Sequence, residues 1–143
     1  MKLDPKRHTW LTDAKTRAVL DALGPDSRFV GGAVRNALLG CEVSDIDIAT
    51  PLLPDVVAKR LTAAGLGAVP TGVEHGTITA IASGTPFEVT TLRRDVATDG
   101  RRAVVAYTTD WKEDAARRDF TMNALYATAD GEVKRRTIRI RLQ

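Results

Sequence analysis

The sequence contains a single cysteine, Cys41, so no internal disulfide bond can form, and we expect the protein in a reducing cytoplasm. No long uncharged apolar run is present, which argues against a membrane-spanning segment. The first five residues lack the apolar core of a secretion signal. Internal repeats, low-complexity stretches and linkers rich in proline and serine are also missing. With 143 residues, 43% of them hydrophobic, we expect one domain with its own core.

The positive charge is concentrated at one end of the chain. The net charge is +3, but residues 134–143 carry five of the 21 lysines and arginines and no acid. Residues 1–133 therefore carry 16 basic and 18 acidic side chains, and they have no general surplus for binding a polyanion. We expect residues 1–133 to form the domain and the basic tail to be a disordered or truncated end. The alternative is one basic-faced strand, because Ile138, Ile140 and Leu142 alternate.

Local patterns predict an α+β domain, with a small mixed sheet flanked by helices. Thr12 and Asp13 are suited to cap a helix, Gly40 to close one, and the turn at residues 83–86 to join a hairpin. The predicted helices cover residues 12–23, 33–39, 54–64, 110–118 and 120–127. The predicted strands cover residues 28–30, 45–49, 77–82 and 87–91, and residues 97–102 are predicted to form a mobile loop.

Gly31 and Gly32 lie where a predicted strand ends and a helix begins. The free N–H groups at a helix N-terminus favour phosphate, and glycine lets the backbone approach a ligand without a Cβ in the way. Arg35, one turn further on, is placed to add a charge-assisted contact to a phosphate oxygen. Glycine pairs are common in turns, so this feature alone is a weak signal.

Asp45 and Asp47 are spaced so that a strand would carry both carboxylates on one face, about 6–7 Å apart at roughly 3.3 Å per residue. Carboxylates at that spacing are suited to share two hard cations. Glu88 follows on another predicted strand and could bring a third carboxylate to the same cations. The competing interpretations are a solvated strand face or turn for the aspartates, and an exposed strand residue for Glu88.

The run from Asp114 to Leu125 is the other unusual segment. Phe120, Ala124 and Leu125 are expected to pack as an apolar stripe, with Arg117 and Arg118 at the joint between two helices and able to reach into a site. The alternative is an ordinary helix with surface ion pairs, such as Asp114 with either arginine.

Together these residues resemble the bacterial-type tRNA nucleotidyltransferase (CCA-adding) and poly(A) polymerase family, within the DNA polymerase β superfamily. The resemblance covers about 100 of the 143 residues, with the motifs in the family's order. The matching segments are residues 29–40, 44–50, 75–77, 87–93, 99–101 and 114–126.

The resemblance implies a nucleotidyltransferase head that transfers nucleotides from CTP and ATP to a tRNA 3′ end with Mg²⁺. It implies that Asp45 and Asp47 hold the metal and that Glu88 supports them. His75 would be a structural residue rather than a base. The residues implied to bind the nucleotide are Gly31, Gly32, Arg35, Arg117, Arg118 and Asn123.

Two features depart from the family pattern. Asn36 stands where the family usually has Asp, at a position that is not a metal ligand. The family also continues after Val133 into a neck that reads the base and domains that grip tRNA, for which the last ten residues offer no counterpart. Three alternatives follow: a nucleotide-binding fragment that cannot elongate RNA, a module that docks a partner protein supplying the neck, and a poly(A) polymerase head.

Overall fold

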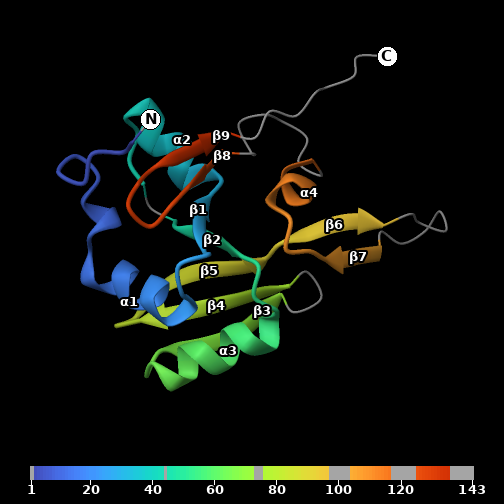
Figure 1. The fold of residues 1–143 in the computed structure, drawn as a ribbon. Coiled ribbons are helices and arrows are strands. Elements are labelled where there is room, and N and C mark those ends of the chain that lie inside the picture. Colours follow the sequence, from blue (N-terminus) through green and yellow to red (C-terminus); the bar gives the residue numbers. More distant parts are fainter. Residues whose placement is uncertain (1, 44, 73–75, 97–103, 117–124, 136–143) are drawn as a thin grey trace, which may run out of the picture.

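The computed structural model describes residues 2–43, 45–72, 76–96, 104–116 and 125–135. The fold is α+β, as predicted, with a mixed sheet flanked by helices (Figure 1). The helical elements are η1 (Thr9–Leu11), α1 (Ala14–Leu23), α2 (Gly32–Leu39), α3 (Pro54–Ala63) and α4 (Trp111–Ala116). No helix among the described residues is long and apolar enough to cross a membrane.

One large sheet organises the described part of the chain, with strand order β3-β4-β5-β2-β1-β8-β9. Its strands are β1 (Arg28–Val30), β2 (Asp47–Thr50), β3 (Gly67–Gly72), β4 (Thr77–Ala82), β5 (Thr85–Thr91), β8 (Leu125–Ala127) and β9 (Val133–Arg135). β2 and β5 pair in parallel, and the other pairs are antiparallel. A separate hairpin of β6 (Arg93–Val96) and β7 (Val104–Tyr107) projects from the sheet (Figure 1).

Local signals account for several element boundaries. The Asp13 carboxylate accepts a hydrogen bond from the Lys15 backbone N–H at 2.9 Å, which caps α1. Gly40 ends α2 in the left-handed region at φ 72°. Ser83 and Gly84 both have positive φ, as a two-residue hairpin turn requires, so β5 begins at Thr85.

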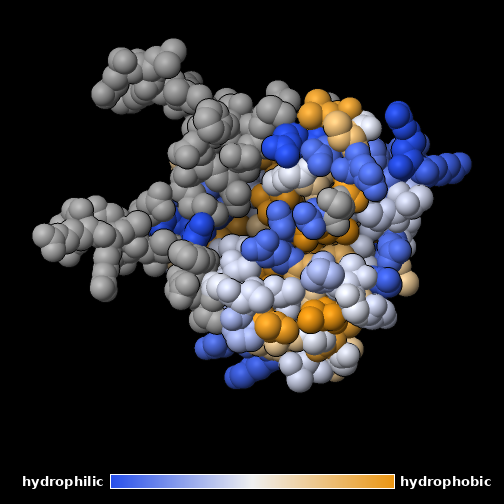
Figure 2. Space-filling view, turned by 180° about the vertical axis from the view of Figure 1, so that it is seen from behind, coloured by the Kyte–Doolittle hydropathy of each residue, from blue (hydrophilic) through white to orange (hydrophobic). Residues whose placement is uncertain are grey.

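The main core lies on one face of the sheet, beneath α1, α2 and α3. It contains large buried side chains such as Phe29, Ile48 and Phe87. The other face carries a smaller cluster of Val30, Ala49, Leu92, Ala115 and Tyr126 under α4, with Trp111 packed against it. Outside these clusters, the view in Figure 2 shows apolar side chains in several groups separated by polar ones, which is ordinary for a surface.

The structure corrects the helix predicted for residues 120–127. Residues 120–124 lie outside the described residues, and Leu125–Ala127 form β8, which pairs with β1 on one side and β9 on the other. All three residues of β8 are buried. A short run buried on both faces has no period-2 pattern, so sequence cannot distinguish it from a buried helix segment.

Other predicted boundaries were partly right. α4 covers residues 111–116 of the helix predicted for 110–118. β6 and β7 lie on either side of the predicted loop, whose residues 97–102 are outside the described part of the chain. β9 includes Lys134 and Arg135, so the sheet extends two residues past the expected domain end; residues 136–143 are not described.

Candidate active site

The parallel pairing of β2 with β5 brings two carboxylates side by side. Asp47 is directly opposite Glu88 in the register, so their side chains leave the same face of the sheet. Both line a pocket of about 310 Å³, together with Asp45, Ile46, Thr79 and Pro86. Three acidic side chains and no basic one are among its described lining residues.

Asp45 reaches this pocket from outside the strand. The strand predicted for residues 45–49 begins only at Asp47, so the two aspartates are not successive same-face residues of one strand. The Glu88 backbone N–H donates to the Ile46 carbonyl at 3.2 Å, which extends the contact with β5 just before β2 begins. This bond anchors the backbone between the two aspartates, and the exposed Asp45 lines the pocket from just before the strand.

The glycine pair lies against the same carboxylates. Gly31 is the N-cap of α2 with φ 74°, a conformation that side chains rarely adopt. A Cβ at Gly31 would lie 3.7 Å from the Asp47 Oδ2 atom, and one at Gly32 would lie 3.6 Å from Arg35 Nη2. The free N–H groups of α2, the Arg35 guanidinium and the Asp47 carboxylate are therefore neighbours.

Asn36, the position that departs from the family pattern, has a local structural contact. Its side-chain amide donates to the Glu42 carbonyl at 3.2 Å, which holds the loop after α2. Its Oδ1 atom accepts from Arg35 Nε at a long 3.4 Å. Asn36 thus supports the loop that leads to Asp45 rather than lining the pocket.

Several predicted site residues cannot be placed. Arg117, Arg118 and Asn123 lie outside the described residues, as does His75. α4 ends at Ala116, directly before Arg117 in the sequence, and β8 begins at Leu125.

Sequence reasoning missed the buried role of Asp114. This side chain is 1% exposed, and its carboxylate accepts from the Tyr126 hydroxyl at 2.9 Å and from the Arg93 backbone N–H at 3.1 Å. It is therefore not the surface carboxylate that the ion-pair alternative assumed. Buried charged groups usually require such partners, but no spacing pattern in the sequence shows that Asp114 faces inward.

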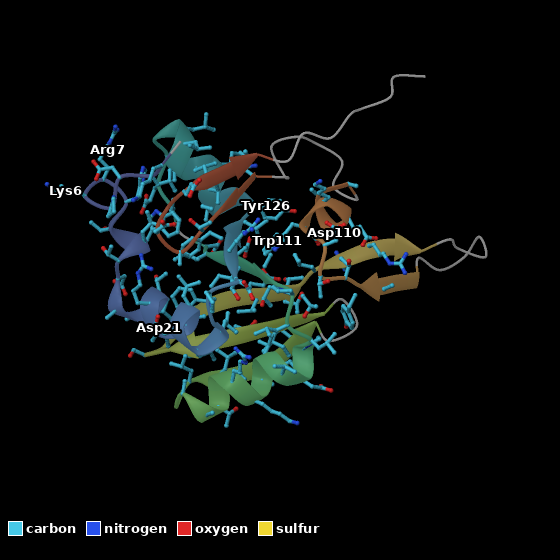
Figure 3. The ribbon with its side chains drawn as sticks, in the orientation of Figure 1. Lys6, Arg7, Asp21, Asp110, Trp111 and Tyr126 are labelled. Carbon is cyan, nitrogen blue, oxygen red and sulfur yellow. The ribbon has the colours of Figure 1, made fainter. Side chains whose placement is uncertain are left out.

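Aromatic contacts attach the same helix to the sheet. Trp111 and Tyr126 pack edge to face with ring centroids 5.0 Å apart, and the two side chains are neighbours in Figure 3. The Arg28 guanidinium lies 4.2 Å from the centre of the Trp111 ring. These contacts, together with the Asp114 hydrogen bonds, fix α4 against the sheet.

The carboxylates that line the pocket are compatible with one mode of magnesium binding. Among the described residues, no group of three His, Cys, Asp or Glu side chains is close enough to form a complete metal cage. Mg²⁺ usually binds through one or two carboxylates together with waters and substrate phosphates. Asp45, Asp47 and Glu88 beside a phosphate-binding type of loop fit that mode, because a bound triphosphate would supply the remaining oxygen ligands.

Away from the pocket, the turn between β8 and β9 perturbs the pKa of Asp130. The Thr128 hydroxyl donates to the Asp130 carboxylate in the turn between β8 and β9 and lowers the pKa of this exposed group. This effect concerns the turn and not the candidate site.

A mixed sheet with paired carboxylates on neighbouring strands, beside a Gly-Gly helix start, defines a domain of the nucleotidyltransferase class. The family model of the poly A polymerase head domain matches residues 27–137. The chain belongs to this family, and the resemblance found in the sequence is confirmed.

Named relatives agree with this assignment. The human mitochondrial CCA tRNA nucleotidyltransferase 1 is 48% identical over 105 residues, which are 73% of this chain and 24% of that protein. The crystal structure of the Bacillus stearothermophilus CCA-adding enzyme in complex with CTP superimposes with a TM-score of 0.70 at 36% identity, covering 86% of this chain and 29% of that one.

A tRNA nucleotidyltransferase complexed with a primer tRNA and an incoming ATP analog gives a TM-score of 0.57 at 31% identity, covering 76% of this chain and 30% of that one. The matched part of the chain therefore covers only 24–30% of the length of these relatives.

Proposed function

We propose that this domain is the catalytic head of an enzyme that transfers nucleotides from CTP and ATP to the 3′ end of tRNA. The observation that carries the proposal is the pocket lined by Asp45, Asp47 and Glu88 beside the Gly31-Gly32 loop. Relatives with 31–48% identity are CCA-adding or tRNA nucleotidyltransferases; one solved structure among them contains CTP and another contains a primer tRNA with an incoming ATP analog.

We assign the negative side of the site to the three carboxylates. Asp45 and Asp47 would hold Mg²⁺, and Glu88, opposite Asp47, would support them. Bound there, the metal would activate the RNA 3′-hydroxyl and neutralise the triphosphate and the leaving pyrophosphate.

We assign the phosphates to the start of α2. Backbone N–H groups at Gly31 and Gly32 and the Arg35 guanidinium are suited to bind phosphate oxygens at the positive end of the helix. Arg117, Arg118 and Asn123 complete the triphosphate site in this proposal. Their support is the motif itself, which lies inside the segment matched by the family.

Selection of the incoming nucleotide's base requires contacts other than those to metal and phosphate. Strong selection requires groups that hydrogen-bond one base edge, whereas the described pocket offers carboxylates and an adjacent phosphate-type loop. We assign base selection and the grip on tRNA to regions that the longer relatives have beyond the matched part, or to a partner protein that supplies them. We also place the protein in the cytoplasm, where the exposed free Cys41 is stable in reduced form.

The test is calorimetric titration of the chain with CTP and with ATP, with and without Mg²⁺. We expect metal-dependent binding that falls at least tenfold, or about 1.4 kcal/mol, in the Asp45→Asn/Asp47→Asn variant. The matched control is Asp21→Asn/Asp55→Asn, which removes the same charge from exposed positions on α1 and α3 outside the pocket lining (Asp21 is labelled in Figure 3).

Unchanged metal-dependent binding in the pocket variant would overturn the assignment. If a protein containing this head transfers nucleotides, addition of A alone to the RNA would favour the poly(A) polymerase alternative. Triphosphate binding with no transfer to a tRNA lacking its terminal nucleotides would favour the nucleotide-binding fragment.

A further inference from the structure

The carboxylates belong to a row of side chains that crosses the sheet. In the register, Val69 of β3 is opposite Thr79 of β4, Thr79 is opposite Glu88 of β5, and Glu88 is opposite Asp47 of β2. Directly opposite residues share a face, so all four side chains lie on the face that bears the pocket. Thr79 lines that pocket, and Val69 is 41% exposed beyond it.

The two ends of this row differ in chemistry. On the β1 side of Asp47 lie Gly31, the N-terminus of α2 and Arg35, which are suited to the triphosphate. On the β4 side of Glu88 lie neutral hydroxyl groups. Phosphoryl transfer places the attacking and leaving oxygens roughly in line on opposite sides of the phosphorus. If the leaving pyrophosphate lies toward α2, the attacking sugar must approach from the Thr79 side.

Thr79 does not stand alone on that side. Its Oγ1 atom is 2.7 Å from Oγ1 of Thr71 on β3, so one hydroxyl donates to the other. A hydroxyl has one donor and two acceptor positions. The pair therefore fixes the orientation of Thr79 and still has a donor and acceptor positions for a ligand. Thr79 is half-buried and lines the pocket, and Thr71 is exposed on the neighbouring strand, so neither hydroxyl is closed off from solvent.

We propose that the Thr71–Thr79 hydroxyl pair binds the ribose of the acceptor RNA's terminal nucleotide through its 2′-hydroxyl. The 2′-hydroxyl is on the carbon next to the attacking 3′-hydroxyl, so a sugar placed for attack beside Glu88 has its 2′-hydroxyl within reach of the neighbouring strand that carries Thr79. A contact of this kind distinguishes RNA from DNA. The inference rests on the proposed function, because that function sets which side the acceptor occupies.

A purely structural role is the competing explanation. Threonine is favoured in strands, and cross-strand threonine pairs add modest stability. Thr77 of β4 and Thr90 of β5 provide the comparison, because their Oγ1 atoms are 3.2 Å apart on the same face of the sheet, yet neither lines the pocket.

The test follows threonine methyl signals by NMR during titration with the dinucleotide cytidylyl-cytidine, in Mg²⁺ and CTP. We expect the Thr79 and Thr71 methyl signals to shift with the dinucleotide, and the Gly31 and Gly32 amide signals to shift with CTP. In Thr79→Val the affinity for the dinucleotide should fall about three- to tenfold, as for loss of one neutral hydrogen bond, with CTP affinity unchanged. Thr90→Val should bind both ligands like the wild type.

The same dinucleotide with a 2′-deoxy terminal nucleoside completes a double-mutant cycle, in which removal of the ligand hydroxyl is compared with removal of the Thr79 hydroxyl. It should bind the wild type more weakly and be insensitive to Thr79→Val, because the contact is already lost. Equal loss for both dinucleotides, or an equal loss of CTP affinity and melting temperature, would overturn the inference in favour of a structural role. Failure of the wild type to bind CTP with metal would instead overturn the proposed function.

Discussion

The two faces of the central sheet differ in what they contain. The face under α1, α2 and α3 is apolar, and its side chains, such as Phe29 and Ile48, are fully buried. The opposite face carries a hydrogen-bonded cluster under α4 and, beside it, the pocket with three carboxylates. Because successive residues of a strand point to opposite faces, the same strands supply the core on one side and the chemistry on the other. Stability and ligand binding should therefore respond to different substitutions on the same strands.

The largest effect on stability is expected on the apolar face. Phe29→Ala removes a fully buried ring that packs edge to face with Trp10 at 4.9 Å. We expect a loss of about 3–5 kcal/mol in the free energy of unfolding, measured in urea. Phe29→Leu retains most of the volume and should cost less. A loss below 1 kcal/mol for the alanine variant would show that this face is not the main core.

A smaller effect is expected in the cluster under α4. Tyr126→Phe keeps the ring against Trp111 but removes the hydroxyl that donates to the buried Asp114. Leaving a buried acceptor without one donor should lower the free energy of unfolding by about 1–3 kcal/mol. Urea unfolding followed by tryptophan fluorescence measures this. Tyr107→Phe, at an exposed position, is the control, and its free energy of unfolding should stay close to that of the wild type. Equal losses in the two variants would contradict a special role for the buried Tyr126 hydroxyl.

The smallest effect on stability is expected in the pocket. Glu88 is exposed, and Glu88→Gln should change the free energy of unfolding by no more than about 0.5 kcal/mol. The same variant should lose much of the extra stability that Mg²⁺ and CTP give to the wild type, since a ligand stabilises the state that binds it. Thermal unfolding with and without Mg²⁺ and CTP measures both quantities. If Mg²⁺ and CTP stabilise Glu88→Gln as much as the wild type, Glu88 does not contribute to the binding site.

Local sequence patterns predict the ends of helices correctly where a residue's role depends on its neighbours in sequence. Asp13 caps α1, Gly40 ends α2 and Pro54 begins α3, each for a reason visible within a few residues. The glycine pair was likewise predicted to start a helix, and it does so at Gly32.

Local sequence patterns do not predict secondary structure or burial where these depend on partners that are distant in the sequence. The helix predicted for residues 120–127 rests on an apolar stripe of Phe120, Ala124 and Leu125, but pairing with β1, nearly a hundred residues earlier in the chain, makes residues 125–127 a strand. One of the two interpretations of the run from Asp114 to Leu125 places Asp114 in a surface ion pair, yet the Tyr126 hydroxyl and the Arg93 backbone N–H donate to its buried carboxylate. In both cases the deciding contact is not encoded in the local pattern.

The sequence by itself determined the α+β class, the Gly-Gly helix start and the identity of the acidic residues, because each depends on residue type and short-range spacing. Only the tertiary structure decided that Asp47 and Glu88 are direct neighbours, since their strands are joined by a helix and two further strands and meet only through parallel pairing. It also decided that Thr79 continues their row and that α4 is fixed over the sheet by a buried carboxylate. Hydrogen-bond register between distant strands, rather than local propensity, sets these relations.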